Sequence, residues 1–140
     1  MMKVMVLVKA NEDSENGVMP SEELLTEMGK YNEELVSAGI MLDGDGLRPS
    51  SKATRVEFSP DGAPTVTDGP FAETKELVAG YWVWQVKDRD EAIEWARRIP
   101  NTDNKHGIVE IREFVTAEDF GLSPDQTRKI EELRDQVGKD

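Results

Sequence analysis

The apolar positions of this chain follow strand-like runs in some segments and helix-like spacings in others. Residues 4–8 form an unbroken apolar run, which predicts a central strand covered on both faces. A polar loop is predicted at residues 10–20. Beyond it, apolar residues recur every three or four positions and predict a helix over residues 22–38. Ser21 is suited to cap the start of this helix, and Gly39 follows its end.

The middle of the chain predicts a short strand and then a hairpin. Residues 40–42 can begin a strand, but the Asp and Gly residues at positions 43–46 predict a loop. Apolar and polar residues alternate at positions 54–58, which predicts a strand with one buried face. A turn at residues 59–62 and a returning arm at residues 65–67 complete the predicted hairpin.

The strongest strand pattern lies at residues 77–86, where Trp82 and Trp84 share one face. A second helix that ends at Pro100 and a last strand over residues 106–115 are predicted after it. The resulting order is strand, helix, strand or hairpin, strand, helix, strand. This order is typical of an α+β fold of the ferredoxin-like split βαβ type, with an antiparallel sheet.

We divide the chain into an α+β domain at residues 1–115 and a helical extension at residues 116–140. In the extension, Ser123, Pro124 and Gln126 match the N-cap, N1 and N3 preferences of a helix start. The helix has a narrow apolar stripe, and an isolated helix of this length is marginal in water. We therefore expect it to dock either on the domain or on a partner subunit.

The predicted plan places both helices of the domain on one face of the sheet and leaves the other face bare. Either Trp82 and Trp84 or Tyr81 and Val83 lie on this bare face. A monomer would then expose a large apolar patch. We expect two copies to pack these faces together and enclose a cavity in which a ligand can bind.

Composition narrows the classes of function. A chain of 140 residues fits one domain, and its net charge of −12 argues against binding to nucleic acid. We find no signal peptide, and no apolar run approaches the roughly 20 residues that cross a bilayer. The absence of cysteine excludes disulfides, thiolate metal sites and cysteine nucleophiles. We expect a cytoplasmic protein that binds neither nucleic acid nor membrane.

Residues 68–76, Asp-Gly-Pro-Phe-Ala-Glu-Thr-Lys-Glu, resemble the signature of the DGPF proteins, a branch of the YCII-related family. The likeness extends over residues 2–115 and includes the segments 2–5, 37–40 and 106–112. It implies a dimeric α+β barrel, a fold shared with small isomerases, cofactor-free monooxygenases and haem-binding enzymes. Members of the wider family are suspected of acid–base catalysis by a His and Asp pair. DGPF proteins are often associated with extracytoplasmic-function sigma factors.

Three residues are candidates for catalysis. His106 is the only histidine, so a proton transfer near neutral pH would use it first. Asp68 is the candidate partner of His106, and Lys75 is placed to steady a developing anion. A structural interpretation stays open for two of them: His106 bonds a nearby carbonyl, and Asp68 closes a turn.

Four further residues are candidates for ligand contacts. Phe71 and Glu73 follow the predicted hairpin, at a loop position where ligand contacts concentrate. Trp82 and Trp84 can stack on a flat ligand or serve as core or interface packing. The acidic segment 43–46 lacks the remaining ligands of a calcium loop. We expect no metal and no cofactor.

Two classes of function remain open. The first is a cofactor-free enzyme that acts on a small carbonyl-bearing or aromatic compound and uses His106, Asp68 and Lys75 for acid–base chemistry. The second is a non-catalytic ligand sensor or partner-binding module, linked to sigma-factor regulation. The first requires the three side chains to line one cavity, and the second requires only a pocket and an exposed patch.

Overall fold

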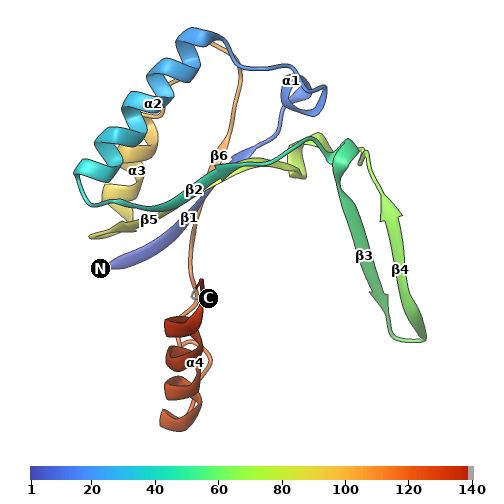
Figure 1. Cartoon of the computed structure of the whole chain (residues 1–140), viewed down its shortest axis with the longest axis vertical. Helices are drawn as coiled ribbons and strands as arrows, with labels where there is room; N and C mark the ends of the chain where they lie inside the picture. The colour runs from blue at the N-terminus through green and yellow to red at the C-terminus, as the bar shows by residue number, and fades with distance from the viewer. Residues whose placement is uncertain (139–140) are drawn as a thin grey trace.

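A four-stranded antiparallel sheet with two helices on one face forms the body of the protein (Figure 1). The structure is a computed structural model that describes residues 1–138. The sheet consists, in spatial order, of β2 (Met41–Gly46), β5 (Val78–Val86), β1 (Met2–Lys9) and β6 (Val109–Glu113). The helices are α1 (Glu12–Glu15), α2 (Glu22–Ser37), α3 (Arg89–Arg97) and α4 (Pro124–Gln136). A separate hairpin pairs β3 (Thr54–Ser59) with β4 (Gly62–Asp68), and two short 3₁₀ turns are η1 (Ser50–Lys52) and η2 (Thr74–Glu76). The predicted α+β class with an antiparallel sheet is confirmed.

The core lies between the sheet and helices α2 and α3. Val4 pairs with Trp84 and Val6 with Trp82, so these four side chains share the face that the helices cover. Leu35 of α2 is fully buried against them. Trp82 and Trp84 are therefore core residues. Of the two alternatives for the bare face, the pairing register selects Tyr81 and Val83.

Tyr31 links the two covering helices. Its hydroxyl donates a hydrogen bond of 2.6 Å to the backbone carbonyl of Trp95 in α3. Burial raises the pKa of the Tyr31 phenol well above its usual range. The phenol therefore stays protonated and keeps this bond at ordinary pH. The predicted start of α2 is also confirmed, because the Ser21 hydroxyl accepts from the backbone N–H of Leu24.

The prediction of a loop at residues 43–46 is wrong, because β2 continues through Gly46. The segment is held in the strand by its pairing with β5, where Gly44 lies opposite Trp82. A Cβ atom at Gly44 would lie 2.9 Å from the Trp82 side chain. Glycine is thus needed for close approach, and sheet pairing overrides the weak strand preference of Asp and Gly.

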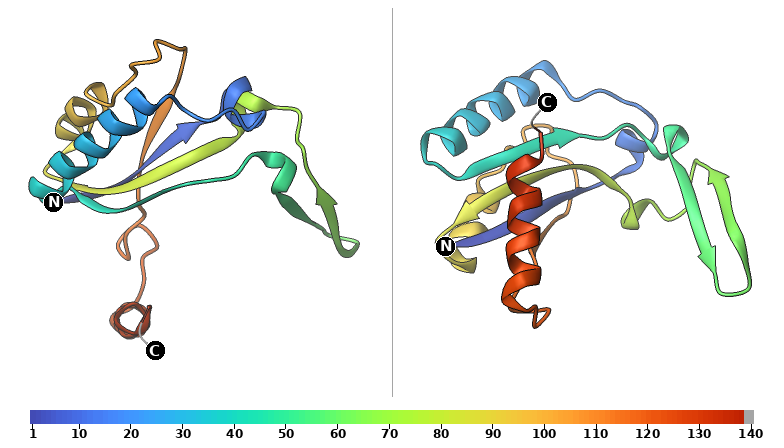
Figure 2. Two further views of the ribbon diagram at one scale, coloured as in Figure 1. Left: turned by 45° about the horizontal axis from the view of Figure 1, so that its top comes forward. Right: turned by 60° about the horizontal axis from the view of Figure 1, so that its bottom comes forward.

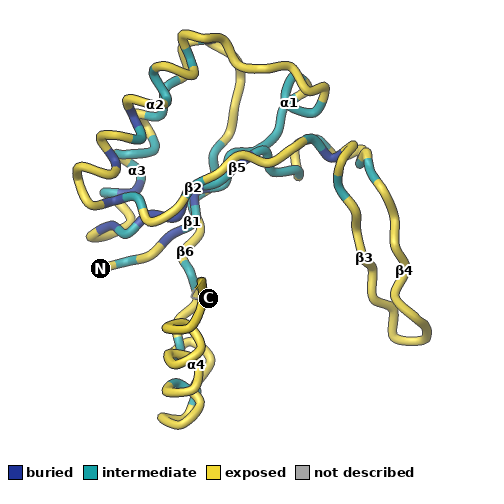
Figure 3. The backbone as a smooth tube through the Cα atoms, viewed as in Figure 1, coloured by how far each residue is buried: buried dark blue, intermediate teal, exposed yellow. Residues whose placement is uncertain are grey.

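The prediction that the hairpin has a buried face is also wrong. Every residue of β3 and β4 is exposed, including Phe58 at 78% and Val66 at 68%. The hairpin extends away from one end of the sheet, where no other element covers it (Figure 3). The alternating pattern correctly predicts that the hairpin has an apolar face and a polar face. Periodicity does not reveal whether another element covers the apolar face.

Two predicted bounds also differ from the structure. The segment 10–20, predicted as a loop, contains the short helix α1, which Asn11 caps by accepting from the backbone N–H of Ser14. The last strand is shorter than residues 106–115, because only β6 (Val109–Glu113) pairs with β1.

Helix α4 stands apart from the body. It lies on the side of the sheet opposite α2 and α3, as Figure 2 shows. Every residue of α4 is exposed except Thr127, which is half-buried. The predicted capping box at Ser123 and Gln126 is confirmed. The helix does not cover the bare sheet face. Residues 139–140 of the predicted extension lie outside the described residues.

Candidate functional site

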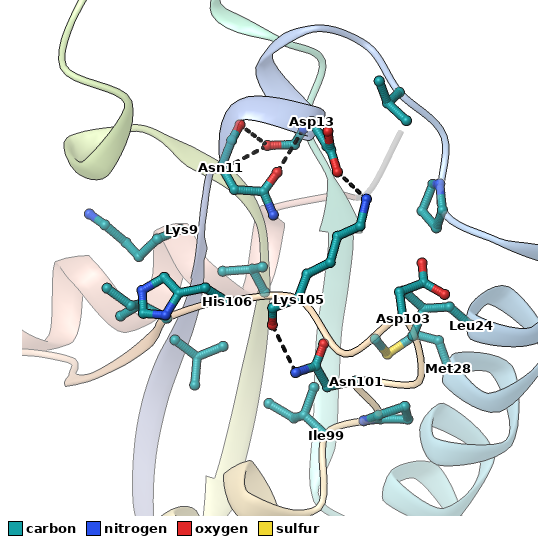
Figure 4. A pocket seen from close by; sticks show the side chains of 18 of the residues that line it. Lys9, Asn11, Asp13, Leu24, Met28, Ile99, Asn101, Asp103, Lys105 and His106 are labelled. Carbon is teal, nitrogen blue, oxygen red and sulfur yellow. Dashed lines mark hydrogen bonds and ion pairs between the residues drawn. The ribbon is translucent and has the colours of Figure 1, made fainter.

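A pocket of about 330 Å³ lies between the sheet, helices α2 and α3, and the loop that leads into β6 (Figure 4). Its apolar lining includes Val8, Leu24, Met28, Trp82, Ala96, Ile99 and Val109, together with the more exposed Val18, Met19 and Ile108. Small-molecule sites typically range from about 300 to 1,000 Å³ and are mostly apolar. The pocket therefore has the size and lining of a site for a small molecule.

Polar side chains gather at the mouth of this pocket. They are Lys9, Asn11, Asp13, Ser14, Asn101, Asp103, Lys105 and His106. The Lys105 ammonium pairs with the Asp13 carboxylate, and this hydrogen bond raises the pKa of Lys105. On the opposite wall, the Ser21 hydroxyl donates to the Asp103 carboxylate. The segment 101–107 is thus tied to both sides of the mouth.

His106 lies at the rim of the pocket. It is exposed, and Figure 4 shows its ring turned toward Lys9 and away from Leu24 and Met28. A ligand that occupies the mouth could reach the ring, whereas the apolar floor is lined by other residues. The structure thus places one of the three predicted catalytic residues at the pocket.

Asp68 and Lys75 do not line this pocket. Asp68 ends β4, is exposed, and accepts a hydrogen bond of 3.1 Å from the Thr54 hydroxyl. This bond ties the two hairpin strands together. It replaces the expected turn closure, since the residue two positions ahead is Pro70, which has no N–H. Lys75 lies exposed in η2. That Asp68 and Lys75 act together with His106 in catalysis stays a prediction.

The two candidate tryptophans differ in position. Trp82 lines the pocket, and its indole N–H donates a hydrogen bond of 2.9 Å to the side-chain oxygen of Asn32. This bond fixes the ring orientation. Trp84 is fully buried in the core and does not line the pocket. Only Trp82 is placed to contact a ligand there.

Phe71 and Glu73 lie near the base of the hairpin. The guanidinium of Arg55 stacks 3.6 Å from the centre of the Phe71 ring. Glu73 is exposed and directly precedes η2. Neither residue lines the pocket that contains His106. Their predicted ligand contacts stay a prediction.

The Asp-Gly-Pro-Phe segment has a clear structural role at this base. Buried Ser50 donates its backbone N–H and its hydroxyl to the Glu15 carboxylate and accepts from the backbone N–H of Phe71 at 3.0 Å. A Cβ atom at Gly69 would lie 1.8 Å from the Ser50 carbonyl oxygen. The segment thus packs directly on η1 and joins the hairpin to α1.

The sequence interpretation missed most of the polar mouth. Asp13 and Lys105 are far apart in the chain and meet only in the folded structure. One signal was available: the polar segment 101–105 immediately precedes the only histidine. The apolar positions of the first predicted helix include Leu24 and Met28, which both line the pocket, and Met28 also packs against the core.

Within residues 1–138, none of the helices has both the length and the apolar character needed to span a bilayer. Over the same residues, the His, Asp and Glu side chains form no group of three or more suited to hold a metal ion.

Comparison with known proteins places the chain in a family. The model of the YCII-related domain matches residues 2–117, which contain the sheet, the hairpin and α1 to α3 but not α4. An uncharacterized protein of Rhizobium meliloti (strain 1021) is 30% identical over 105 residues, which cover 73% of this chain and 84% of that protein. The chain therefore belongs to the YCII-related domain family.

Proposed function

We propose that this protein binds a small, largely apolar molecule in the pocket between the sheet and helices α2 and α3. The observation that carries the proposal is the combination of an apolar floor with polar groups that converge at the mouth. Leu24, Met28 and Ile99 offer contact surface to an apolar ligand body. A ligand that displaces water from such a floor gains free energy in proportion to its buried apolar area.

The mouth favours a neutral polar group on the ligand. The charges of Lys105 and Asp13 neutralise each other, and Lys9 and Asp103 add one charge of each sign, so the mouth has no excess of either charge among these four residues. The side chain of Asn101 donates to the backbone carbonyl of Lys105 and leaves its own oxygen as an acceptor. A small carbonyl-bearing or hydroxyl-bearing compound with an aliphatic or aromatic body suits this arrangement.

Binding is supported better than acid–base catalysis. The catalytic hypothesis needs His106, Asp68 and Lys75 around one ligand, and only His106 lines the pocket. Binding needs only the floor and the mouth. A cytoplasmic location and a link to sigma-factor regulation belong to this proposal as expectations from the sequence and the family resemblance.

A thermal-shift screen tests the binding proposal. We expect a small aliphatic or aromatic ketone, phenol or alcohol to stabilise the protein, by about 2.7 kcal/mol when present at 100 times its dissociation constant. The variant Ala96→Leu adds volume inside the pocket and should abolish this stabilisation. The matched variant Ala38→Leu adds the same volume at an exposed position outside the lining and should preserve it. A ligand whose effect survives Ala96→Leu would place binding elsewhere.

We also propose that the protein is a homodimer that pairs over the bare sheet face. The centre of this face carries Met5 opposite Val83 and Leu7 opposite Tyr81. None of the helices covers these side chains. Val83 is nevertheless only 8% exposed, and the other three are half-buried. The apolar patch is thus smaller than the sequence pattern suggests, but it is continuous across two central strands.

Sedimentation velocity tests the pairing. We expect the protein to sediment as a dimer at micromolar concentration and Leu7→Glu to sediment as a monomer, because the carboxylate would be buried without a partner. The variant Val36→Glu places the same charge on the exposed side of α2 and should leave the dimer intact. A monomeric parent protein at every concentration would contradict the proposal.

A further inference from the structure

Two segments of the chain project from the body and bury little surface against it. We call β3 and β4 the hairpin arm and α4 the helical arm. Both consist almost entirely of exposed residues. An isolated two-stranded hairpin and an isolated helix of this length are each marginal in water. Both arms therefore need a surface that their own chain does not supply.

The hairpin arm has one apolar face with acidic ends. Val56 pairs directly with Val66, and Phe58 follows two positions after Val56, where the pairing register shifts between Glu57 and Ser59. Asp68 lies on this face at the base of the arm, opposite Thr54, and Asp61 lies in the turn at its tip. The exposed apolar face is thus bounded by carboxylates at both ends.

The helical arm has the complementary pattern. Its exposed apolar residues Ile130 and Leu133, with the C-cap residue Val137 directly after its end, are spaced by three and four positions and form one stripe. At about 100° per residue, Lys129 and Arg134 flank this stripe on either side. Neither forms an ion pair among residues 1–138. The apolar stripe is therefore bordered by two free positive charges.

The acidic residues of α4 lie on the other side of the helix. By the same helical spacing, Glu131, Glu132 and Asp135 point away from the stripe. Arg128 shares that outer side and pairs with Asp125 and Glu132. The outer surface of the helical arm is therefore solvated and carries more negative than positive charge, and the apolar stripe lies on the opposite side.

The charges beside the two apolar surfaces favour contact between a helical arm and a hairpin arm. Two copies of the α4 stripe facing each other would bring Lys129 and Arg134 of both chains together, and like charges beside a helix seam are unfavourable. Two hairpin faces would bring Asp61 and Asp68 together. A stripe on a hairpin face avoids both repulsions, and because Asp61 and Asp68 lie about 20 Å apart whereas Lys129 and Arg134 lie about 7.5 Å apart along the helix, it can bring one cation to one carboxylate. The lengths also match, since 13 helical residues and a six-residue strand each span about 20 Å.

The position of the arms points to a second copy as the partner. In Figure 1 and in the left view of Figure 2, α4 and the hairpin both descend on the side of the sheet away from α2 and α3, apart from each other. That side holds the bare face over which we propose pairing. A two-fold axis there would carry the arms of each chain to the other chain and generate the same contact twice.

We infer that the α4 stripe of one copy packs on the Val56, Phe58 and Val66 face of a second copy, and the reverse. This contact rests on the proposed homodimer and adds to it a reciprocal clasp by the two arms. It also gives a role to the segment beyond the family match, which ends at residue 117.

Cross-linking of the full chain tests the clasp, because the protein contains no cysteine of its own. We would make Val66→Cys and Leu133→Cys separately, mix the two variants to allow subunit exchange, and add a short bismaleimide. We expect the mixture to give a covalent dimer at least tenfold more abundant than either variant gives alone. Efficient cross-linking of Leu133→Cys by itself would show that two α4 helices pair, and would overturn the inference.

A chain with both substitutions supplies the remaining outcomes. We expect it to cross-link into a covalent dimer. An internally linked monomer would show that each α4 docks on its own hairpin, which also overturns the inference. Absence of any link while sedimentation still shows a dimer would reject the clasp and leave pairing over the sheet. If the protein sediments as a monomer, both the clasp and the proposed homodimer are rejected. The ligand-binding proposal is tested separately by the thermal-shift screen.

Sedimentation of arm variants provides a second readout. Leu133→Ser and Phe58→Ser should each weaken dimerisation at least tenfold, and the two combined should weaken it little further, because both remove the same contact. Val36→Ser, at an exposed apolar position on α2, should leave the dimer unchanged. Circular dichroism would verify that the variants stay folded. Wild-type dimerisation by both arm variants would overturn the inference.

Discussion

Replacing Trp84 with alanine is expected to lower the free energy of unfolding by about 3–5 kcal/mol. Trp84 is the largest fully buried side chain of the protein, and its ring lies 5.9 Å from that of Trp82. Its neighbour across the strand pair is Val4, which is also buried. Alanine would leave a cavity that strands on both sides of β5 prevent from collapsing. Urea unfolding followed by far-UV circular dichroism measures the loss.

The variant Trp84→Phe separates packing from hydrogen bonding. The buried indole N–H of Trp84 has no hydrogen-bond partner among residues 1–138. Phenylalanine removes this unpaired donor and keeps most of the ring, so we expect it to cost less than half of what alanine costs. A loss as large as that of Trp84→Ala would mean that the N–H makes a stabilising bond, and would contradict the assignment of Trp84 as an apolar core residue.

Gly69→Ala is expected to detach the base of the hairpin from the body. The added Cβ would lie 1.8 Å from the Ser50 carbonyl oxygen, which is a backbone atom and cannot swing aside. Forced insertion of one carbon into a packed site typically costs about 1–3 kcal/mol, and a clash this close belongs at the upper end. The displacement would also break the bond from the Phe71 N–H to Ser50. Global unfolding and limited proteolysis within residues 50–71 measure the two effects.

Gly62→Ala serves as the matched control for this change. Gly62 begins β4 in the same hairpin, and a Cβ atom there would meet no atom within 4 Å. We expect it to leave both stability and proteolysis unchanged within about 0.5 kcal/mol. If the two alanine variants behave alike, the hairpin base is not held by close packing of Gly69 on η1, and the Asp-Gly-Pro-Phe segment has another role.

The local sequence pattern was sufficient to predict most of the helices and strands, but it predicted few of the residues that line the pocket. Helix α2, its Ser21 cap and the capping box of α4 follow from spacing and from the preferences of a few adjacent residues. Of the seven predicted site residues, His106 and Trp82 line the pocket. His106 was found because it is the only histidine, and Trp82 because aromatic residues of a strong strand pattern must pack on something.

The sequence by itself determined most of the helices and strands, that the sheet is antiparallel in an α+β plan, and that Trp82 and Trp84 share one face. These features depend on contacts between near neighbours and on periodicity. The tertiary structure alone decided that β2 runs through Gly44, that Lys105 meets Asp13 across the pocket mouth, and that the hairpin is uncovered. Each depends on residues distant in the chain, whose encounter is set by how whole elements pack, and no local pattern encodes it.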